Sequence, residues 1–306
     1  SGINSKLKAE GNIILSMQSV NGIDSSRMKA GVFADNLNGE EYKQAIIEGK
    51  NVSISAESTD ATGIYGLYNA YWEDSNVNDR AGNTVNITAN GTGDNGIVEL
   101  KASANNSWSR GIYAEFSETN INAKSIFVKA TSETGNAYGI YANHYSDEWT
   151  NIDNESDVNL HAAETNQVYG TQYGILAKAG NNVAVTDEDA KTNVVLTADM
   201  GDNIVGAGTI DGNGFGSGVA VNVLSGAHTN FTAKSGQNFH HGAIDTRNDG
   251  SNVKLDGLAN IVKSAAIIDA AGDLNEDKNT DPETSFKDRK VISSLYAEDN
   301  ANITVS

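Results

Sequence analysis

Aromatic side chains gather just after a short phrase that recurs along the chain, and their spacing could create a ligand-binding surface. The candidate ligand-binding residues are Tyr71, Trp72, Phe116, His144, Tyr145 and Trp149. Three of them, Tyr71, Phe116 and His144, stand at the same distance after a glycine in successive copies of the phrase. If the copies stack in register, these rings form one outward column that could bind sugar rings or a loop of a partner protein. The alternative is that the rings only cover the bases of loops.

One acidic segment has part of the pattern of a calcium-binding loop. Asp273, Asn275 and Asp277 place oxygen ligands at alternate positions, as the first ligands of such a loop do. Lys278, however, stands where the loop needs glycine, and Thr284 stands where it needs a bidentate glutamate. We therefore expect a solvated loop here, with calcium as the alternative, and we expect no bound cofactor.

Groups that could perform catalysis are not arranged for it. Asp245 and Asp269 are the only acidic pair near equivalent positions of the repeat, whereas glycan-cleaving enzymes use paired carboxylates. The histidines show no metal-binding spacing, and no Gly-x-Ser-x-Gly motif marks a nucleophile. The sequence therefore predicts that the protein is not an enzyme.

The elements that must carry these residues are short strands in a repeating pattern. The recurring phrase reads Gly-aliphatic-aromatic-Ala, as in Gly111–Ala114 and Gly139–Ala142, and a phrase of alternating apolar and polar residues follows each copy. Alternation with a period of two is typical of β-strands, and self-similarity every ~20–50 residues is typical of a solenoid. Because the corners between strand phrases are too short for hairpins, the strands should pair in parallel with those of the next coil. The predicted fold is all-β: a parallel β-helix (β-solenoid) with projecting polar loops.

The alternation also predicts which side chains fill the core. The residues expected to face inward are Val52, Ile54, Val85, Ile87, Ile126, Val128, Val158, Leu160, Val194, Leu196, Val253 and Leu255. We expect the glycine of the recurring phrase to occupy a corner, and its alanine to pack where the cylinder is narrow. Irregular polar insertions are expected near 73–83, 143–156, 199–217 and 271–290.

Composition and charge limit the possible partners. The chain has 306 residues, a formal net charge of −19 and no cysteine. Nucleic acids and anionic membranes attract basic surfaces, so neither is an expected partner, and no segment is apolar enough to insert into a membrane. No shift in composition marks a boundary, so residues 1–306 are expected to form a single β-helix. The chain ends inside a strand phrase, so we expect it to be excised from a longer repetitive protein.

The phrases Tyr138–Ala142 and Tyr173–Ala177, alternating with Asn-Val-x-Ile-x-Ala stretches, resemble the passenger domains of bacterial type V autotransporter adhesins. The resemblance implies a right-handed β-helix on the bacterial cell surface, anchored in the outer membrane by a C-terminal barrel that is missing here. It also implies adhesion, either to copies of the protein on neighbouring cells, leading to aggregation and biofilm, or to host or bacterial surface glycans or proteins. Two other functions stay open: a carbohydrate-active β-helix such as a polysaccharide lyase or a tailspike-like hydrolase, and a spacer stalk with no binding of its own.

Overall fold

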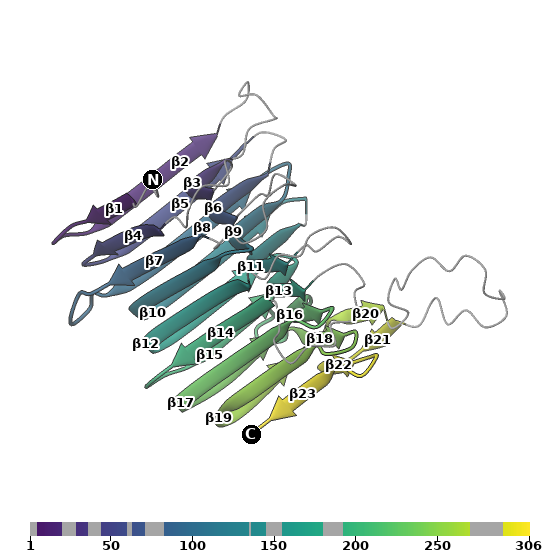
Figure 1. The fold of residues 1–306 in the computed structure, drawn as a ribbon. Helices are drawn as coiled ribbons and strands as arrows, with labels where there is room; N and C mark the ends of the chain where they lie inside the picture. The colour runs from purple at the N-terminus through teal and green to yellow at the C-terminus, as the bar shows by residue number, and fades with distance from the viewer. Residues whose placement is uncertain are drawn as a thin grey trace.

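The strands of the protein stack into a parallel β-helix, as Figure 1 shows for the computed structural model. The structure describes residues 5–19, 29–35, 44–59, 63–70, 83–134, 136–144, 155–179, 192–269 and 290–306. Every regular element within these ranges is a strand, and no membrane-spanning helix is found among them. The prediction of an all-β parallel β-helix is confirmed.

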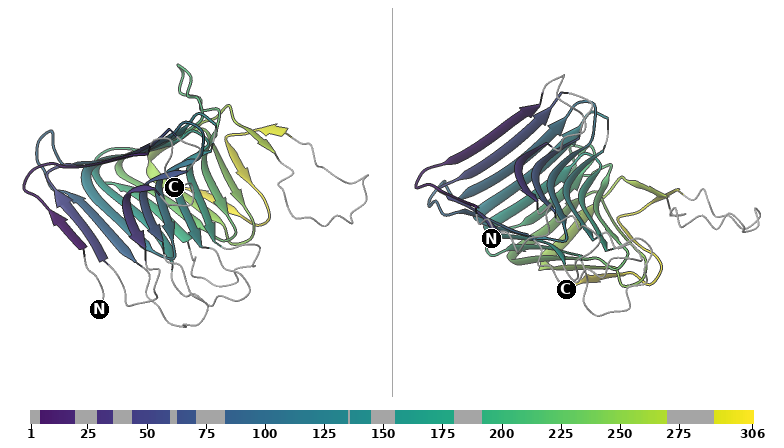
Figure 2. Two further views of the ribbon diagram at one scale, coloured as in Figure 1. Left: turned by 90° about the horizontal axis from the view of Figure 1, so that it is seen from above. Right: turned by 45° about the horizontal axis from the view of Figure 1, so that its top comes forward.

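Three ladders of parallel strands form the sides of the helix, and Figure 2 shows their coils stacked along one axis. Face 1 contains β1 (Ser5–Lys8), β4 (Gln44–Gly49), β7 (Thr84–Ala89), β14 (Thr192–Ala198), β23 (Asn302–Val305) and the first halves of β10 (Glu118–Ser132), β12 (Ser156–Gly170), β17 (His228–His241) and β19 (Asn252–Lys263). Face 2 contains β2 (Ile13–Ser19), β5 (Val52–Ser58), β8 (Ile97–Ala104), β15 (Asn203–Ala207) and the second halves of β10, β12, β17 and β19. Face 3 contains β3 (Ala30–Asp35), β6 (Ile64–Ala70), β9 (Ser109–Glu115), β11 (Ala137–His144), β13 (Tyr173–Ala179), β16 (Val219–Leu224), β18 (Ala243–Arg247) and β22 (Leu295–Ala297).

The long strands serve two faces because each bends near its middle. The first half of β10 pairs with β7 and the second half with β8, and its register with β12 shifts between Ala123 and Ser125. The coils differ in length: Ser5 pairs with Ala45 one coil later, whereas His228 pairs with Asn252. Insertions therefore change the length of a coil without changing the ladders.

The alternating residues fill the core as predicted. All twelve are at most 1% exposed: Val52, Ile54, Val85, Ile87, Ile126, Val128, Val158, Leu160, Val194, Leu196, Val253 and Leu255. The register places them in four columns, two on face 1 and two on face 2. On face 1, Ile121 pairs with Ile87 in the coil before it and with Leu160 in the coil after it. On face 2, Leu100 pairs in the same way with Ile54 and Val128.

The prediction that the recurring glycine occupies a corner is wrong. Gly111, Gly139 and Gly174 lie within the strands of face 3, where the ladder skips them: Tyr138 pairs with Tyr173, and Ile140 with Ile175. A Cβ on Gly139 would lie 2.5 Å from the Gly174 carbonyl oxygen and 2.6 Å from Val168 Cγ1. The glycine is needed because a backbone and a core side chain approach it closely, not because the chain turns there.

We expect Gly139→Ala to lower the free energy of unfolding by about 1–3 kcal/mol, because the added methyl overpacks a site that backbone atoms line. Gly11→Ala is the matched control, since nothing lies within 4 Å of a Cβ there. Urea unfolding followed by circular dichroism would measure both variants. Equal midpoints for the two variants would contradict the close packing of face 3.

The insertions differ in part from the prediction. Residues 203–207, expected to be irregular, form β15, which pairs with β12 and β17 on face 2; the chain leaves the coil only after it, where Ile210 and Gly216 form an antiparallel bridge. The segment near 271–290 lies mostly outside the described residues, but β20 (Ile267–Asp269) and β21 (Lys290–Ile292) pair in antiparallel fashion at its two ends. Most of 73–83 and 143–156 also lies outside the described residues.

A column of asparagines continues one of the inward apolar columns of face 2, because Ile126 pairs with Asn166 in the next coil. Asn166 Nδ2 donates to Asn203 Oδ1 at 2.9 Å, Asn203 Nδ2 to Asn238 Oδ1 at 2.9 Å, and Asn238 Nδ2 to Asn260 Oδ1 at 2.7 Å. Asn260 Nδ2 in turn donates to the backbone oxygen of Ser306 at 3.1 Å. The first three residues of this asparagine ladder are fully buried, so each of their amides donates to the next asparagine where water cannot reach.

A histidine occupies the next inward column of face 2. His240 pairs with Val205 on one side and with Val262 on the other, and its ring meets Phe231 edge-on at 4.8 Å between centroids. The side chain is 1% exposed, and neither ring nitrogen has a hydrogen-bond partner. Burial lowers the pKa of His240 to about 3, so the ring is neutral in the folded protein.

Candidate ligand-binding face

Only two of the predicted ligand-binding residues lie within the described residues. Phe116 and His144 are neighbours, as the predicted column requires, with ring centroids 4.7 Å apart. They are only 6% and 4% exposed, however, so these two rings do not form an exposed surface. The physical reason is a pair of hydrogen bonds to Ser156, at the start of β12. Phe116 N donates to Ser156 Oγ at 2.8 Å, and Ser156 Oγ donates to the Asn143 carbonyl oxygen at 2.8 Å. These bonds hold the ends of β9 and β11 against the start of β12.

The remaining candidates cannot be placed. Tyr71, Trp72, Tyr145 and Trp149 lie outside the described residues, as do the three calcium candidates Asp273, Asn275 and Asp277. Their roles stay predictions. Within the described ranges, no three His, Asp or Glu side chains come together as a metal site would require.

A different aromatic column does run along face 3, built from the aromatic residue of the recurring phrase itself. Phe33, Tyr68, Tyr113 and Tyr141 follow one another in the ladder. The Phe33 and Tyr68 rings stack at 4.9 Å, Tyr68 and Tyr113 at 5.4 Å, and Tyr113 meets Tyr141 edge-on at 5.4 Å. These side chains point away from the core, because the inward-facing Ile112 and Ile140 precede Tyr113 and Tyr141.

A second column lies beside the first, and an arginine interrupts it. Tyr65 pairs with Arg110, Arg110 with Tyr138, and Tyr138 with Tyr173. The Tyr138 and Tyr173 rings stack at 5.5 Å with their planes 8° apart. Both columns face outward because the ladder skips the glycine between them, which turns two side chains three residues apart to the same side.

Arg110 is the centre of this surface, which we call the aromatic patch. Its Cζ atom lies 4.5 Å from the ring centroid of Tyr141, 4.6 Å from that of Trp108, 4.7 Å from that of Tyr113, 5.5 Å from that of Tyr65 and 5.8 Å from that of Tyr138. Cation–π attraction of this kind positions the guanidinium. The patch consists of Phe33, Tyr65, Tyr68, Trp108, Arg110, Tyr113, Tyr138, Tyr141 and Tyr173.

The patch is buried at its centre and accessible around it. Tyr65, Tyr68 and Tyr113 are at most 7% exposed. Trp108, Arg110, Tyr138, Tyr141 and Tyr173 are half-buried, and Phe33 is 48% exposed. The accessible part therefore consists of Phe33 and the half-buried side chains around the guanidinium of Arg110.

The phenols of Tyr65, Tyr113, Tyr138 and Tyr141 stay protonated at neutral pH. Burial raises the pKa of Tyr65, Tyr138 and Tyr141 above the usual range, although the nearby Arg110 charge opposes the shift. Burial also raises the pKa of Tyr113 strongly, and the carboxylate of Glu115 adds to this effect. The tyrosines can donate hydrogen bonds and pack against apolar surfaces, but they do not supply a base.

Glu115 lies at the end of the patch and is fully engaged. Tyr113 Oη donates to Glu115 Oε2 at 2.6 Å, and Asn143 Nδ2 donates to Glu115 Oε1 at 3.0 Å. Burial raises the pKa of Glu115, while these two hydrogen bonds oppose the rise. Both oxygens of this carboxylate thus hold neighbouring side chains in place.

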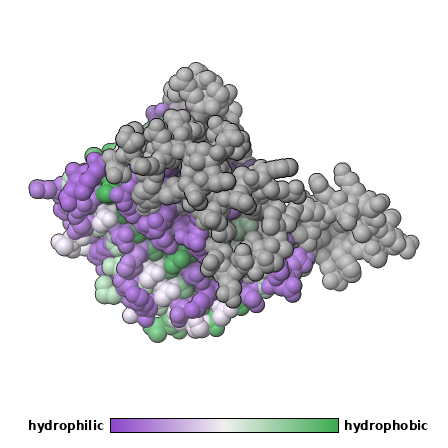
Figure 3. Space-filling model, viewed as in Figure 1, coloured by the Kyte–Doolittle hydropathy of each residue, from purple (hydrophilic) through white to green (hydrophobic). Residues whose placement is uncertain are grey.

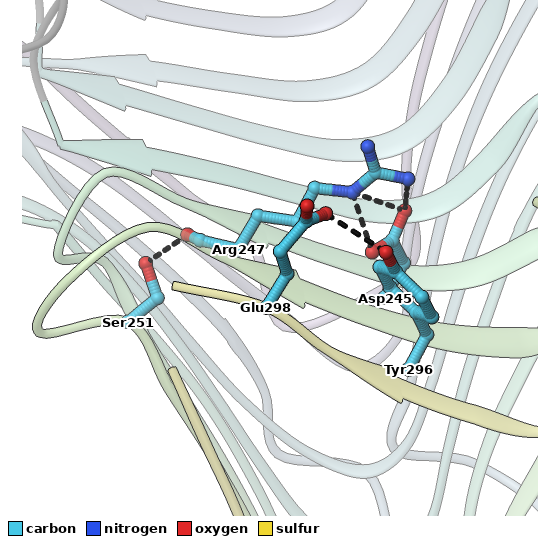
Figure 4. Close-up of polar contacts among 5 residues, drawn as sticks. All are labelled: Asp245, Arg247, Ser251, Tyr296 and Glu298. Carbon is cyan, nitrogen blue, oxygen red and sulfur yellow. Dashed lines mark hydrogen bonds and ion pairs between the residues drawn. The ribbon is translucent and has the colours of Figure 1, made fainter. Parts of the chain in front are cut away.

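The acidic pair considered for catalysis is not brought together. Asp245 lies on face 3 and pairs with Asn222 and Tyr296, whereas Asp269 belongs to the antiparallel β20–β21 pair. Figure 4 shows Asp245 bound by Arg247, whose Nε lies 2.9 Å from Oδ1 and whose Nη2 lies 2.9 Å from Oδ2. The expectation that Asp245 and Asp269 occupy equivalent positions is wrong, and Asp245 forms a structural ion pair.

The outer side of face 1 is polar and regular. Asn120 Nδ2 donates to Asn86 Oδ1 at 3.2 Å, and Asn159 Nδ2 donates to Asn120 Oδ1 at 3.0 Å. Asn122 and His161 stand in the next outward column and are exposed. Where Figure 3 displays described residues, hydrophilic side chains dominate the surface and apolar ones are scattered among them.

Face 2 has a shallow hollow on its outer side. Its rim is formed by Glu99, Lys101, Phe127, Lys129, Gln167 and Tyr169. Lys101 Nζ is paired with Glu99 at 2.6 Å, and Lys129 Nζ lies 5.7 Å from the centroid of the Tyr169 ring. The hollow resembles the aromatic patch in having a cation beside a ring, but on a much smaller scale.

No family model matches the chain, and no curated protein and no solved structure matches it either. Its function must therefore be inferred from its own surfaces. The patch escaped the sequence analysis because the tyrosine of the recurring phrase was given no role. The signal was present: Arg110 stands directly before Gly111, at the position that Tyr138 and Tyr173 hold before Gly139 and Gly174.

Proposed function

We propose that the chain is an adhesive module of a bacterial cell-surface protein of the autotransporter type, which binds other copies of itself or surface glycans and proteins through the outer sides of its β-helix. The observation that carries this proposal is the polar outer side of face 1. Its asparagines occupy the same outward position in three successive coils and bond along the axis, from Asn86 through Asn120 to Asn159. The module acts as a rod, and this part of face 1 presents the same neutral polar group in three successive coils.

Self-association follows from the regular spacing of the coils. Neighbouring strands in a sheet lie about 4.8 Å apart, so any second copy of the rod presents its polar groups at the same interval. A contact that is favourable at one coil is then repeated at the next. A surface that pairs with its own copy also needs few uncompensated charges, and the outward positions Asn86, Asn120 and Asn159 are neutral.

The charge of the whole chain sets the conditions for association. A net charge of −19 repels a second copy at long range, and added salt screens this repulsion. Association through short-range hydrogen bonds should therefore strengthen as salt rises, whereas association through cation bridges should require calcium. A response to neither would remove self-association from the proposal.

Bacteria that display the complete surface protein would test the adhesive function. We expect Asn122→Glu to slow the settling of a cell suspension on the order of tenfold, because it adds a negative charge to a contact between two acidic copies. Gln167→Glu is the matched control: it is also exposed and also adds one negative charge, but it lies on face 2. Settling is expected to be unchanged in the control.

Deleting the whole β-helix gives the decisive comparison. Aggregation and attachment that persist without residues 1–306 would overturn the adhesive function and favour a spacer. Release of oligosaccharides from a panel of polysaccharides by the purified chain would favour the alternative of a carbohydrate-active enzyme.

A further inference from the structure

We propose that the aromatic patch binds a saccharide that carries a single carboxylate, with the carboxylate on the Arg110 guanidinium and the sugar rings against the neighbouring aromatic side chains. This site is separate from the self-association surface of face 1. It gives the proposed adhesive module a ligand of defined chemistry, but it does not require that copies of the chain bind one another.

Within the part of the chain that the structure describes, Arg110 forms no ion pair, although the charge of the nearby Glu115 interacts with it at longer range. The chain contains 40 Asp and Glu residues against 21 Lys and Arg, yet no carboxylate forms an ion pair with Arg110 among the described residues. Its Nε is buried without a hydrogen-bond partner. The other described arginine, Arg247, holds Asp245 through two nitrogens. That nitrogen of Arg110 is shielded from solvent, so an incoming anion would bind the terminal nitrogens of the guanidinium, which are not among its buried unpartnered atoms.

The rings around Arg110 position it for one kind of anion. Five aromatic rings lie within 6 Å of its Cζ atom and fix the plane of the guanidinium. No described group accepts a hydrogen bond from the terminal guanidinium nitrogens, and the side chain is half-buried, so these N–H groups can donate to a ligand. A planar guanidinium offers two parallel N–H groups, and this geometry matches a carboxylate.

The rest of the patch suits a sugar. Trp108, Tyr138, Tyr141 and Tyr173 are half-buried, so part of each side chain is accessible to a ligand. The C–H side of a pyranose ring packs against such side chains, and the protonated phenols can donate to its hydroxyl groups. Because Tyr138 and Tyr173 stack at 5.5 Å along the axis, the patch is elongated, as a short linear oligosaccharide is.

The number of carboxylates follows from the charge around the site. Arg110 is the only cation in the patch, and the chain has a net charge of −19. A polyanion would place its further charges against an acidic protein, whereas one carboxylate on an otherwise neutral saccharide would not. The ligand class is therefore a mono-anionic oligosaccharide.

Isothermal titration calorimetry of the purified chain with 3′-sialyllactose as the probe would test the site. We expect measurable binding, a loss of about tenfold or more with lactose or with the carboxyl amide of 3′-sialyllactose, and no tighter binding of heparin. Arg110→Gln should lose about tenfold or more, and Arg110→Lys should lose less because it keeps the charge. Lys129→Gln is the matched control, since it removes a lysine beside a ring on face 2, and it should bind like the wild type.

Each contrary result has a definite meaning. Absence of binding, or equal affinity for the acid and for its amide, would overturn the proposal without the need for any variant. Heparin binding more tightly than 3′-sialyllactose would show that the site takes polyanions or sulfates instead. Loss of binding in Lys129→Gln alone would move the site to face 2. None of these outcomes depends on cell aggregation, so failure here and failure of the adhesive function can be told apart.

Discussion

Lowering the pH from 7 to 4 is expected to cost the protein about 3 kcal/mol of folding free energy through His240 alone, and the His240→Val variant is expected to escape this loss. In the folded protein the pKa of His240 is about 3, because the ring is buried; in the unfolded chain a histidine titrates near its ordinary value of 6.5. Between these two values the unfolded state binds a proton that the folded state does not. Stability from this residue is therefore complete above pH 6.5 and declines as the pH falls toward 3.

Valine suits the position because its neighbours in the column are Val205 and Val262. At pH 7 the variant should be at least as stable as the wild type, since it removes two ring nitrogens that have no partner. Urea unfolding at pH 7, 6, 5 and 4 would give the free energy of unfolding for both proteins. Carboxylates contribute equally to both curves, so the difference between the curves isolates His240; parallel curves would show that this ring is not buried and neutral.

The second large effect is expected at the centre of the asparagine ladder. Asn203→Ala should lower the free energy of unfolding by roughly 3–5 kcal/mol, because it leaves a cavity and removes the donor of a buried amide oxygen. Asn203 Nδ2 donates to Asn238 Oδ1 at 2.9 Å and to the Leu196 carbonyl oxygen at 3.3 Å. Both acceptors would lose a partner that water cannot replace.

Two further substitutions show whether the ladder acts through burial. Asn260→Ala, at the half-buried end of the ladder, should cost about 1 kcal/mol, and the exposed Asn122→Ala should change stability by less than about 0.5 kcal/mol. Chemical denaturation of the three variants would establish the order. A loss at Asn203 no larger than that at Asn260 would mean that the central amides are not shielded from water.

The core of the helix could be predicted from the sequence because its signal is local. Side chains such as Val158 and Leu160 alternate with polar neighbours, and a strand with one buried side needs nothing more to place them inward. The stacking of the copies was also readable, since Phe116 and His144 are neighbours as their spacing indicated. Their burial was not readable, because it depends on Ser156, a residue some forty positions after Phe116.

The features that the sequence analysis missed arise from contacts between coils. Gly139 resembles a turn residue until the approach of Val168 from face 2 is known. Residues 203–207 look irregular because they begin with a polar side chain. Asn203 can nevertheless be buried, because its amide forms hydrogen bonds with Asn166 and Asn238 in the neighbouring coils. The patch around Arg110 likewise needs two columns of face 3 to turn outward together. A period-of-two pattern contains none of this information.

The asparagine ladder has a direction: every amide donates toward the next coil, from Asn166 to the backbone oxygen of Ser306. Excision of one whole turn between Asn166 and Asn238 would bring two compatible ends together, and duplication of a turn would add one more link of the same sense. After either event, no further buried asparagine amide would lack a hydrogen-bond partner. Proteins built on this scheme can therefore gain or lose length in complete turns during evolution, while a change of part of a turn would break the chain of donors.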